Sequence, residues 1–389
     1  MGLLDTIKDS ISSIVPVTAG SRSAVGLDIG TSSIKVVQLR KEKGKALLET
    51  YGEIAIGPYA SVESGRATHP SAESAVPAIK DLLREANVAA LDAGVSIPFS
   101  AAMTRVIKVP RLGKEQLSKI IPIEARKFIP MPLNEVVLNW FIIPERPGSQ
   151  AQESTRSLNV FNKDKNIDFQ DALIVAIHKD AVANMQSIAR QTDLQVSFFE
   201  LETFSAIRSS VEYELSSTML LDIGATSSKV YVVEAGVLHF SHLINLGAQN
   251  ITENIMRSFT WPFEKAERVK KEIGLNKNSA MSVFDEKDRL MFEQVVENAV
   301  NRIFTEVNRV MIGYEKKNNK PISRVVLSGG GANMHGILDF AVKKLSVDVL
   351  KADPFAKVHA PAFLNDVLKG IGPDFAVATG LALRRLESN

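Results

Sequence analysis

The sequence predicts an α/β protein made of two similar halves, and three observations support this fold class. Residues 27–35 read LDIGTSSIK and residues 221–229 read LDIGATSSK, so one short pattern occurs twice. A short apolar run precedes each copy, and a run rich in β-branched residues follows it. Stretches with helical periodicity lie between the strand candidates, which is typical of sheets covered by helices.

Length, composition and charge narrow the class further. A chain of 389 residues is long enough for about two to four domains. Apolar residues make up 45% and charged residues 23%, the profile of an ordinary globular protein, and the net charge of +2 gives no reason to expect a nucleic-acid partner. The chain has no cysteine, which excludes disulfides and thiolate metal sites. No apolar run is long enough to span a bilayer, and no secretory signal is visible.

Residues 1–23 are expected to form a separate, amphipathic N-terminal segment. Five apolar residues fall at helical spacing: Leu3, Leu4, Ile7, Ile11 and Ile14. The polar face carries both charge signs and has no Trp or Arg, unlike a typical interfacial helix. We therefore favour a helix packed on the body or on a neighbour, or a frayed terminus, over a weak membrane-surface anchor.

The first half is assigned residues 24–106 and 179–215. Its expected elements, in chain order, are a hairpin and a third strand over 25–56, a helix over 71–86, strands over 94–99 and 103–109, and a helix over 179–190. A βαββ insertion at 107–178 interrupts this half. Its expected elements are a helix over 114–128, strands over 136–143 and 171–178, and a polar loop or hairpin tip over 147–168.

The second half is assigned residues 216–255 and 322–389, with a mainly helical insertion at 256–321. It is expected to open with the second hairpin. Helices are predicted over 248–259, 264–273, 291–314, 335–344 and 375–386, and a strand over 324–327.

The two copies of the pattern predict two β-hairpins with polar tips. A tip built from Gly, Ser and Thr can turn its amides and hydroxyls towards a phosphate, and an Asp at the end of the first strand can hold a hydrated Mg²⁺. Asp28 and Asp222 occupy this position, so two facing tips would clamp a polyphosphate from both sides. The alternative is a structural repeat whose chemistry has been lost, but the matched Ser/Thr tips and lysines favour function.

Three more patterns are candidates for a site: a glycine turn, a Glu–Lys pair and an acidic pair. Gly329, Gly330 and Gly331, between a strand and a helix, let a ligand lie against bare backbone, although a plain connection is the alternative. Glu267 and Lys270 share one face of a predicted helix and, taken alone, form an exposed charge pair.

Glu200 and Glu202 lie between the two halves. A carboxylate near such a cleft can orient an attacking or Mg²⁺-bound water, and a solvated acidic pair is the equally open alternative.

The two hairpins, the Gly-Gly-Gly turn and the Ala-Glu-x-x-Lys helix together resemble the actin/Hsp70/sugar-kinase superfamily over residues 25–386. The resemblance implies an actin-like ATPase fold of two RNase-H-like halves, with ATP and Mg²⁺ bound between them. Asp28 and Asp222 would hold Mg²⁺ through water, and Glu202 would be catalytic. The implied nucleotide-binding residues are Gly30, Thr31, Ser32, Ser33 and Lys35, then Gly224, Ala225, Thr226 and Ser227 for the phosphates, and Glu267, Lys270, Gly329, Gly330, Gly331 and Asn333 for adenosine.

The insertion is similar to that of the PilM family of type IV pilus assembly proteins, within the FtsA-like branch. Residues 124–132 (EARKFIPMP), 135–137 (EVV) and 25–35 (VGLDIGTSSIK) carry this similarity. It implies a cytoplasmic ATP-binding scaffold, held peripherally at the inner face of the cytoplasmic membrane through its partner. That partner would be the N-terminal tail of a PilN-like protein, bound between the first core and the insertion. Other pilus platform proteins and further copies of this chain are additional candidate partners.

The sequence departs from this family at Thr203 and in the length of its N-terminal lead, and it leaves two other functions to weigh. Thr203 follows the acidic stretch where a proline is usual, and no strong general base is visible, so we expect ATP hydrolysis to be slow or absent. An FtsA-like filament-forming ATPase of cell division would usually carry a C-terminal linker and amphipathic helix, whereas this chain stops three residues after Leu386. A small-molecule kinase would need a carboxylate base beside its acceptor hydroxyl, and we find no convincing one.

Overall fold

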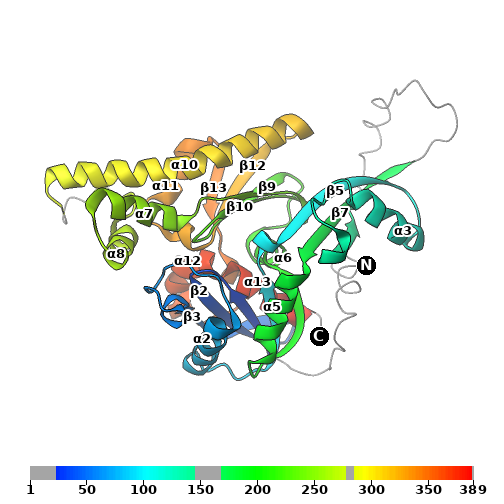
Figure 1. Cartoon of the computed structure of the whole chain (residues 1–389), viewed down its shortest axis with the longest axis horizontal. Coiled ribbons are helices and arrows are strands. Elements are labelled where there is room, and N and C mark those ends of the chain that lie inside the picture. The colour runs from blue at the N-terminus through cyan, green and yellow to red at the C-terminus, as the bar shows by residue number, and fades with distance from the viewer. Residues whose placement is uncertain (1–22, 145–167, 277–283, 388–389) are drawn as a thin grey trace.

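The computed structural model describes residues 23–144, 168–276 and 284–387 (Figure 1). The expected N-terminal segment, apart from Ser23, and the expected loop over 147–168, apart from Asp168, lie outside these ranges. Within the described ranges, no helix is both long and apolar enough to cross a membrane.

Two five-stranded sheets with the same topology form the two halves, as the sequence predicts (Figure 1). The first has the order β3-β2-β1-β4-β8, with β1 Ser23–Ile29, β2 Ser33–Glu42, β3 Lys45–Ala55, β4 Asp92–Ile97 and β8 Gln195–Leu201. The second has the order β11-β10-β9-β12-β13, with β9 Ser217–Ile223, β10 Ser228–Glu234, β11 Val237–Ile244, β12 Ile322–Ser328 and β13 Asp348–Lys351. In each sheet, the first strand of the hairpin pairs antiparallel with the second and parallel with a strand reached by a crossover.

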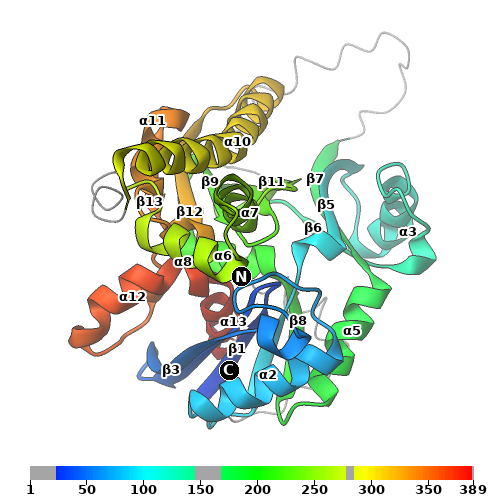
Figure 2. The same ribbon diagram turned by 60° about the vertical axis from the view of Figure 1, so that its left-hand side comes forward.

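Helices cover the faces of both sheets. Those nearest the first sheet are α2 Ala72–Glu85, α5 Lys179–Arg190, α6 Glu202–Ser210 and α13 Ala376–Glu387. Those of the second half are α7 Ala248–Phe259, α8 Phe263–Ile273, α10 Glu286–Asn318 and α11 Ile337–Leu345, and α12 Asn365–Ile371 precedes α13. Figure 2 shows α10 as a long rod along the second half. The apolar cluster of the first sheet continues onto the second sheet through Leu220, Tyr231 and Val326, and a separate cluster packs the other residues of the second sheet against its helices.

Helix α13 departs from the division expected from the sequence. It belongs by sequence to the block 322–389 assigned to the second half, but it packs on β1, β2 and β4 of the first sheet and on α6. Two glycines permit this close approach. A Cβ on Gly380 would lie 1.9 Å from the Ser205 carbonyl oxygen, and one on Gly26 would lie 1.9 Å from that of Ala378. The last helix therefore ties the end of the chain back onto the first half.

The insertion folds as a small three-stranded sheet in the predicted βαββ order. Its elements are β5 Ala102–Pro110, α3 Lys114–Ala125, β6 Val136–Ile142 and β7 Phe169–His178, with the antiparallel order β5-β7-β6. Helix α3 ends three residues before the predicted Phe128, because the N–H groups of Lys127 and Phe128 bond three residues back in a tighter turn. The insertion has a separate apolar core.

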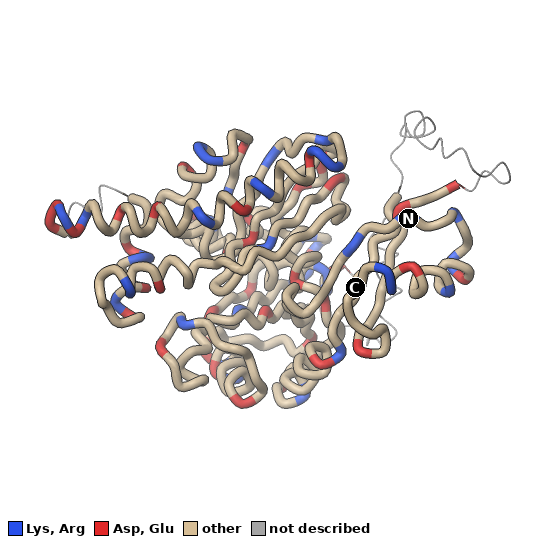
Figure 3. The backbone as a smooth tube through the Cα atoms, turned by 45° about the horizontal axis from the view of Figure 1, so that its top comes forward, with Lys and Arg blue, Asp and Glu red and all other residues tan. Residues whose placement is uncertain are grey.

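Charged residues of both signs are scattered over the two halves rather than gathered by sign (Figure 3). Edge strand β3 is covered along part of its length by His359, which exchanges backbone hydrogen bonds with Ala46 and Leu48. Strand β11, at one edge of the second sheet, lies beside β5 of the insertion (Figure 2). The insertion is thus placed against both halves.

The packing of α13 predicts opposite effects for two helical glycines. Gly380→Ala should destabilise the protein by about 3 kcal/mol or more, because the new methyl group would overlap the Ser205 carbonyl. Gly313→Ala in α10 meets no atom within 4 Å and should stabilise it by about 1 kcal/mol through helix propensity. Urea denaturation midpoints measure both changes, and equal stabilisation by the two variants would contradict this packing.

Candidate functional site

The duplicated pattern forms two β-hairpins, as predicted. In the first, Asp28 of β1 lies opposite Lys35 of β2, and in the second, Asp222 of β9 lies opposite Lys229 of β10. One backbone hydrogen bond closes each turn, 3.1 Å long in the first hairpin and 3.0 Å in the second. Each hairpin therefore presents one carboxylate and one ammonium group side by side on the same face of its sheet.

The backbone carbonyls of the two tips are bonded to neighbouring segments of the chain. In the first tip, the carbonyls of Thr31 and Ser32 accept hydrogen bonds of 2.7 and 3.1 Å from the chain behind the tip. In the second, the carbonyls of Gly224 and Ala225 accept bonds of 2.9 Å from the first two N–H groups of α7. The C=O and N–H groups of a trans peptide point in opposite directions, and the described chain has no cis peptide. The N–H groups of Ser32, Ala225 and Thr226 therefore point away from the segments that bond these carbonyls, and all three residues line one cavity.

A cavity of about 700 Å³ lies between the hairpins, within the size range of small-molecule sites. Every candidate site residue named from the sequence lines it, except Glu200. These are Asp28, Gly30, Thr31, Ser32, Ser33, Lys35, Glu202, Asp222, Gly224, Ala225, Thr226, Ser227, Glu267, Lys270, Gly329, Gly330, Gly331 and Asn333. Residues from five separate stretches of the sequence are thus brought to one place.

Asp28 lies near the end of β1 and lines the cavity. Its Oδ1 accepts a hydrogen bond of 2.8 Å from the Ser96 hydroxyl, whose oxygen also accepts the N–H of Ile29 at 3.1 Å. Burial raises the pKa of Asp28 above its ordinary value, and the nearby Lys35 only partly offsets this effect. The carboxylate is therefore held in place without the charge compensation that would make its ionised form favourable.

Lys229 bridges two carboxylates of the cavity. Its Nζ lies 3.1 Å from Asp222 Oδ2 in its own hairpin and 3.3 Å from Glu202 Oε2 in the first half. The other oxygen of Glu202 accepts the N–H of Phe99 at 2.6 Å. Burial would lower the pKa of Lys229, but the two carboxylates outweigh it and raise this pKa well above its ordinary value. Burial also raises the pKa of Glu202, despite Lys229.

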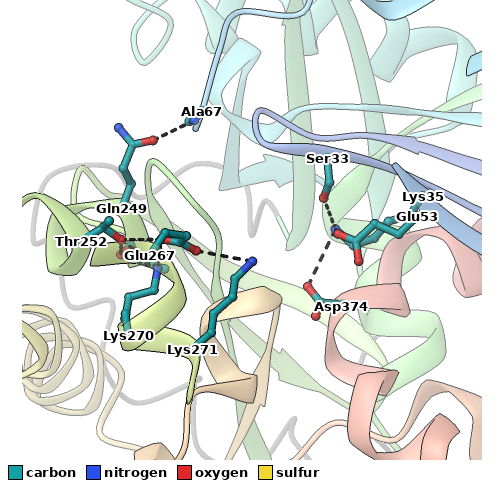
Figure 4. Close-up of polar contacts among 11 residues, drawn as sticks. Ser33, Lys35, Glu53, Ala67, Gln249, Thr252, Glu267, Lys270, Lys271 and Asp374 are labelled. Carbon is teal, nitrogen blue, oxygen red and sulfur yellow. Dashed lines mark hydrogen bonds and ion pairs between the residues drawn. The ribbon is translucent and has the colours of Figure 1, made fainter. Parts of the chain in front are cut away.

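A second lysine bridge was not predicted from the sequence. Lys35 Nζ lies 3.1 Å from Glu53 and 3.8 Å from Asp374, and it donates a 2.7 Å hydrogen bond to Ser33 (Figure 4). Asp374 in turn accepts a 2.8 Å bond from the Asn333 side chain. Burial raises the pKa of Asp374, and Lys35 opposes that shift. Nothing local in the sequence marks Glu53 or Asp374, because only the fold brings them to the hairpin.

Glu267 and Lys270 form a buried network, so the interpretation as an exposed charge pair is wrong. Their side chains lie 2.7 Å apart, and both bond the Thr252 hydroxyl (Figure 4). Lys270 is 6% exposed. Burial lowers its pKa below the ordinary lysine value although Glu267 opposes this. Helix α8 packs these groups against α7, which a charge pattern alone does not reveal.

The Gly-Gly-Gly turn differs from the expected strand–helix junction. Residues Gly330–Asn333 form a 3₁₀ turn, and α11 begins only at Ile337, so no α-helix N-terminus abuts the glycines. Protein contacts account for two of the glycines. Gly329 has φ of +79° and would place a Cβ 2.2 Å from Asp222 Oδ1, and Gly331 would place one 2.3 Å from Ile223.

Glu200 does not belong to the site. Arg208 and Arg384 both pair with it at 2.7 Å, and Ser205 donates a further hydrogen bond. Burial alone would raise the pKa of Glu200, but the two guanidinium groups hold it at about 2. The residue fastens α13 and α6 to β8 and has no free oxygen for catalysis.

The charge balance of the cavity bears on metal binding. Six carboxylates and four lysines line it, which gives a formal charge of −2 before any ligand enters: Asp28, Glu53, Glu202, Asp222, Glu267 and Asp374 against Lys35, Lys229, Lys270 and Lys271. No group of three or more His, Cys, Asp or Glu in the described ranges is arranged as a metal cage. This donor set fits a hydrated Mg²⁺ that enters with an anionic ligand better than a cation held by protein ligands alone.

Known proteins with a similar fold or sequence agree with the predicted fold class and family. The chain is 25% identical over 374 residues to the cell division protein FtsA of Staphylococcus epidermidis, covering 87% of this chain and 74% of that protein. Its fold matches a PilM–PilN type IV pilus biogenesis complex with a TM-score of 0.74 and 23% identity, over 93% of this chain and 98% of that one. It also matches MreB 5 of Spiroplasma citri bound to AMPPNP, with a TM-score of 0.51 and 12% identity, over 95% and 98%.

The predicted actin-like fold is thereby confirmed. The family model described as type IV pilus assembly protein PilM matches residues 26–386, nearly the whole chain. The resemblance noted in the insertion and the first hairpin extends over both halves. The chain therefore belongs to the PilM family of type IV pilus assembly proteins.

Proposed function

We propose that this protein is an ATP-binding scaffold of the type IV pilus inner-membrane assembly platform. One observation carries the nucleotide part of this proposal. Two hairpin tips rich in Gly, Ser and Thr, a glycine turn and a buried Glu–Lys pair line a single cavity between two similar halves. The MreB 5 protein with the similar fold binds AMPPNP, a triphosphate nucleotide analogue, which supports the same ligand class here.

The residues divide the ligand between them. The tip amides and hydroxyls at residues 30–33 and 224–227 bind the phosphates, because these residues carry hydrogen-bond donors and line the cavity. Glu267, Lys270 and the glycine turn with Asn333 border the adenosine. Asp28 and Asp222 hold Mg²⁺ through its water ligands, and the ion supplies the positive charge that the phosphates need beside an acidic cavity wall.

Hydrolysis is slow in this proposal. Glu202, the one candidate for orienting water, already uses one oxygen on the Phe99 amide and the other on Lys229. Burial raises the pKa of Glu202, which makes its carboxylate a stronger base. However, both of its oxygens are engaged, so it has to release a partner before it accepts a proton. Nucleotide binding, rather than turnover, is thus the main event at this site.

The partner of the scaffold is the N-terminal tail of a PilN-like inner-membrane protein. The solved structure with TM-score 0.74 is a PilM–PilN complex, and the family of this chain is that of PilM. The tail binds between the core of the first half and the inserted sheet β5-β7-β6. This binding places the protein at the cytoplasmic face of the inner membrane, and nucleotide state alters the assembly through it.

Substitution Asp28→Asn separates binding from folding. The amide keeps an acceptor oxygen for Ser96 and removes a buried charge, so the nucleotide-free variant should be at least as stable as the wild type at neutral pH. This direction follows from the raised pKa of Asp28 in the folded state. As pH rises from the pKa of the unfolded state through that of the folded state, ionisation of this carboxylate destabilises the folded protein. Mg²⁺·ATP affinity should fall by about 10-fold or more, since the anionic contact to the hydrated ion is lost.

Thermal unfolding and isothermal titration with Mg²⁺·ATP measure the two effects. Asp339→Asn, on an exposed face of α11 outside the cavity, is the matched control and should change neither. Undiminished affinity in Asp28→Asn would remove this residue from the site.

Filament formation is the second candidate function, because the FtsA relative matches most of this chain. The scaffold proposal predicts saturable one-to-one binding of a synthetic peptide with the N-terminal sequence of the PilN-like protein, read by fluorescence anisotropy. A peptide of the same composition in scrambled order is the control. Ordered filaments in electron micrographs with Mg²⁺·ATP and lipid, together with no peptide binding, would favour the FtsA-like function instead.

A further inference from the structure

Strand β10 reaches from the cavity to the insertion. Lys229 and Tyr231 lie two residues apart on this strand, so their side chains share one face of the sheet. Lys229 contacts the cavity carboxylates Asp222 and Glu202. Tyr231 is fully buried and pairs across the sheet with Ser241 of β11. One short rigid segment therefore carries both a site residue and a residue facing the insertion.

Two contacts, one from β10 and one from β11, join this part of the second sheet to the start of β5. The Phe99 ring packs edge-on against the Tyr231 ring, with centroids 5.4 Å apart and an interplanar angle of 88°. The hydroxyls of Thr104 and Ser241 lie 2.5 Å apart. Phe99 is 5% exposed and sits in the turn Phe99–Ala101, directly before β5. We call these four residues the β10–β5 joint.

Glu202 connects the joint to the phosphate end of the cavity. Its Oε1 accepts the Phe99 N–H at 2.6 Å, and its Oε2 pairs with Lys229. A phosphate or a cation arriving beside Lys229 would compete for the same ammonium and carboxylate groups. A change in the Lys229–Glu202 pair would therefore alter the hydrogen bond to the Phe99 amide, just before the first strand of the insertion.

We propose that the β10–β5 joint is the route by which the nucleotide state of the cavity changes the position of the inserted sheet. This inference rests on the proposed nucleotide binding and specifies how that binding regulates the partner groove. The coupling has two parallel branches. One runs from Lys229 through Glu202 to the Phe99 amide, and the other runs along β10 to the Tyr231 ring and, across β11, to Thr104.

Hydrogen exchange of the segment 99–110 tests this route without a partner protein. In the wild type, Mg²⁺ with AMPPNP should change the exchange of this segment. Tyr231→Leu removes the ring contact and should reduce that change by about half, because the branch from Lys229 through Glu202 to the Phe99 amide remains. Nucleotide affinity should change by less than about 3-fold, because Tyr231 does not line the cavity. Tyr231→Phe keeps the ring and its contact with Phe99, so it should behave as the wild type.

Ser241→Ala provides a milder variant if Tyr231→Leu fails to fold, and it should lower the ligand-induced change to an intermediate value. A full ligand-induced change that persists in Tyr231→Leu or in Ser241→Ala would overturn the joint as the route while leaving nucleotide binding intact. An exchange pattern in the wild type that is unaffected by bound AMPPNP would overturn the coupling itself. Absence of AMPPNP binding, seen by titration of the same sample, would overturn the proposed function as well.

Discussion

The structure depends on two buried lysines that neutralise carboxylates in the cleft. Lys35 and Lys229 occupy equivalent positions in the duplicated hairpin, and each lies between one acidic group of its own half and another brought in by the fold. Lys229 joins its own Asp222 to Glu202 of the first half, and Lys35 reaches Asp374. Removing either lysine would leave carboxylates buried without a counter-charge, which is far costlier than losing an exposed ion pair.

These ion pairs also explain how the cleft can respond to a ligand. A fully neutralised cavity would accept a polyphosphate with little rearrangement, but here the carboxylates exceed the lysines by two. The pKa values of Asp28, Glu202 and Asp374 are raised by burial, so a cation that enters the site would favour the ionised forms of these groups. Helix α13, whose first residues line the cavity, packs closely on α6 and β1. The β10–β5 joint lies beside Lys229, where a rearrangement of these ion pairs could be transmitted to the insertion.

The sequence predicted the parts of the fold and site that are written locally. The repeat defined both hairpins, and periodicity defined most helices within a few residues of their bounds. Strand β8 and α6 were not predicted, since their residues carry no clean period. Burial of Lys270 and the roles of Glu53 and Asp374 depend on contacts between distant segments, which no local pattern encodes. The Gly-Gly-Gly turn lines the cavity, but close contacts with Asp222 and Ile223 already require two of its glycines, which the local pattern does not reveal.

The most direct test of this account is the ATP affinity of the wild-type protein with and without a divalent cation. Isothermal titration in excess Mg²⁺ and then in excess EDTA, at constant ionic strength, measures it. An acidic cavity without a preformed metal cage predicts binding in Mg²⁺ and an affinity at least about 100-fold weaker in EDTA. Equal affinity under the two conditions would contradict the account, because the hairpin tips would then hold the phosphates without the cation that the cleft requires.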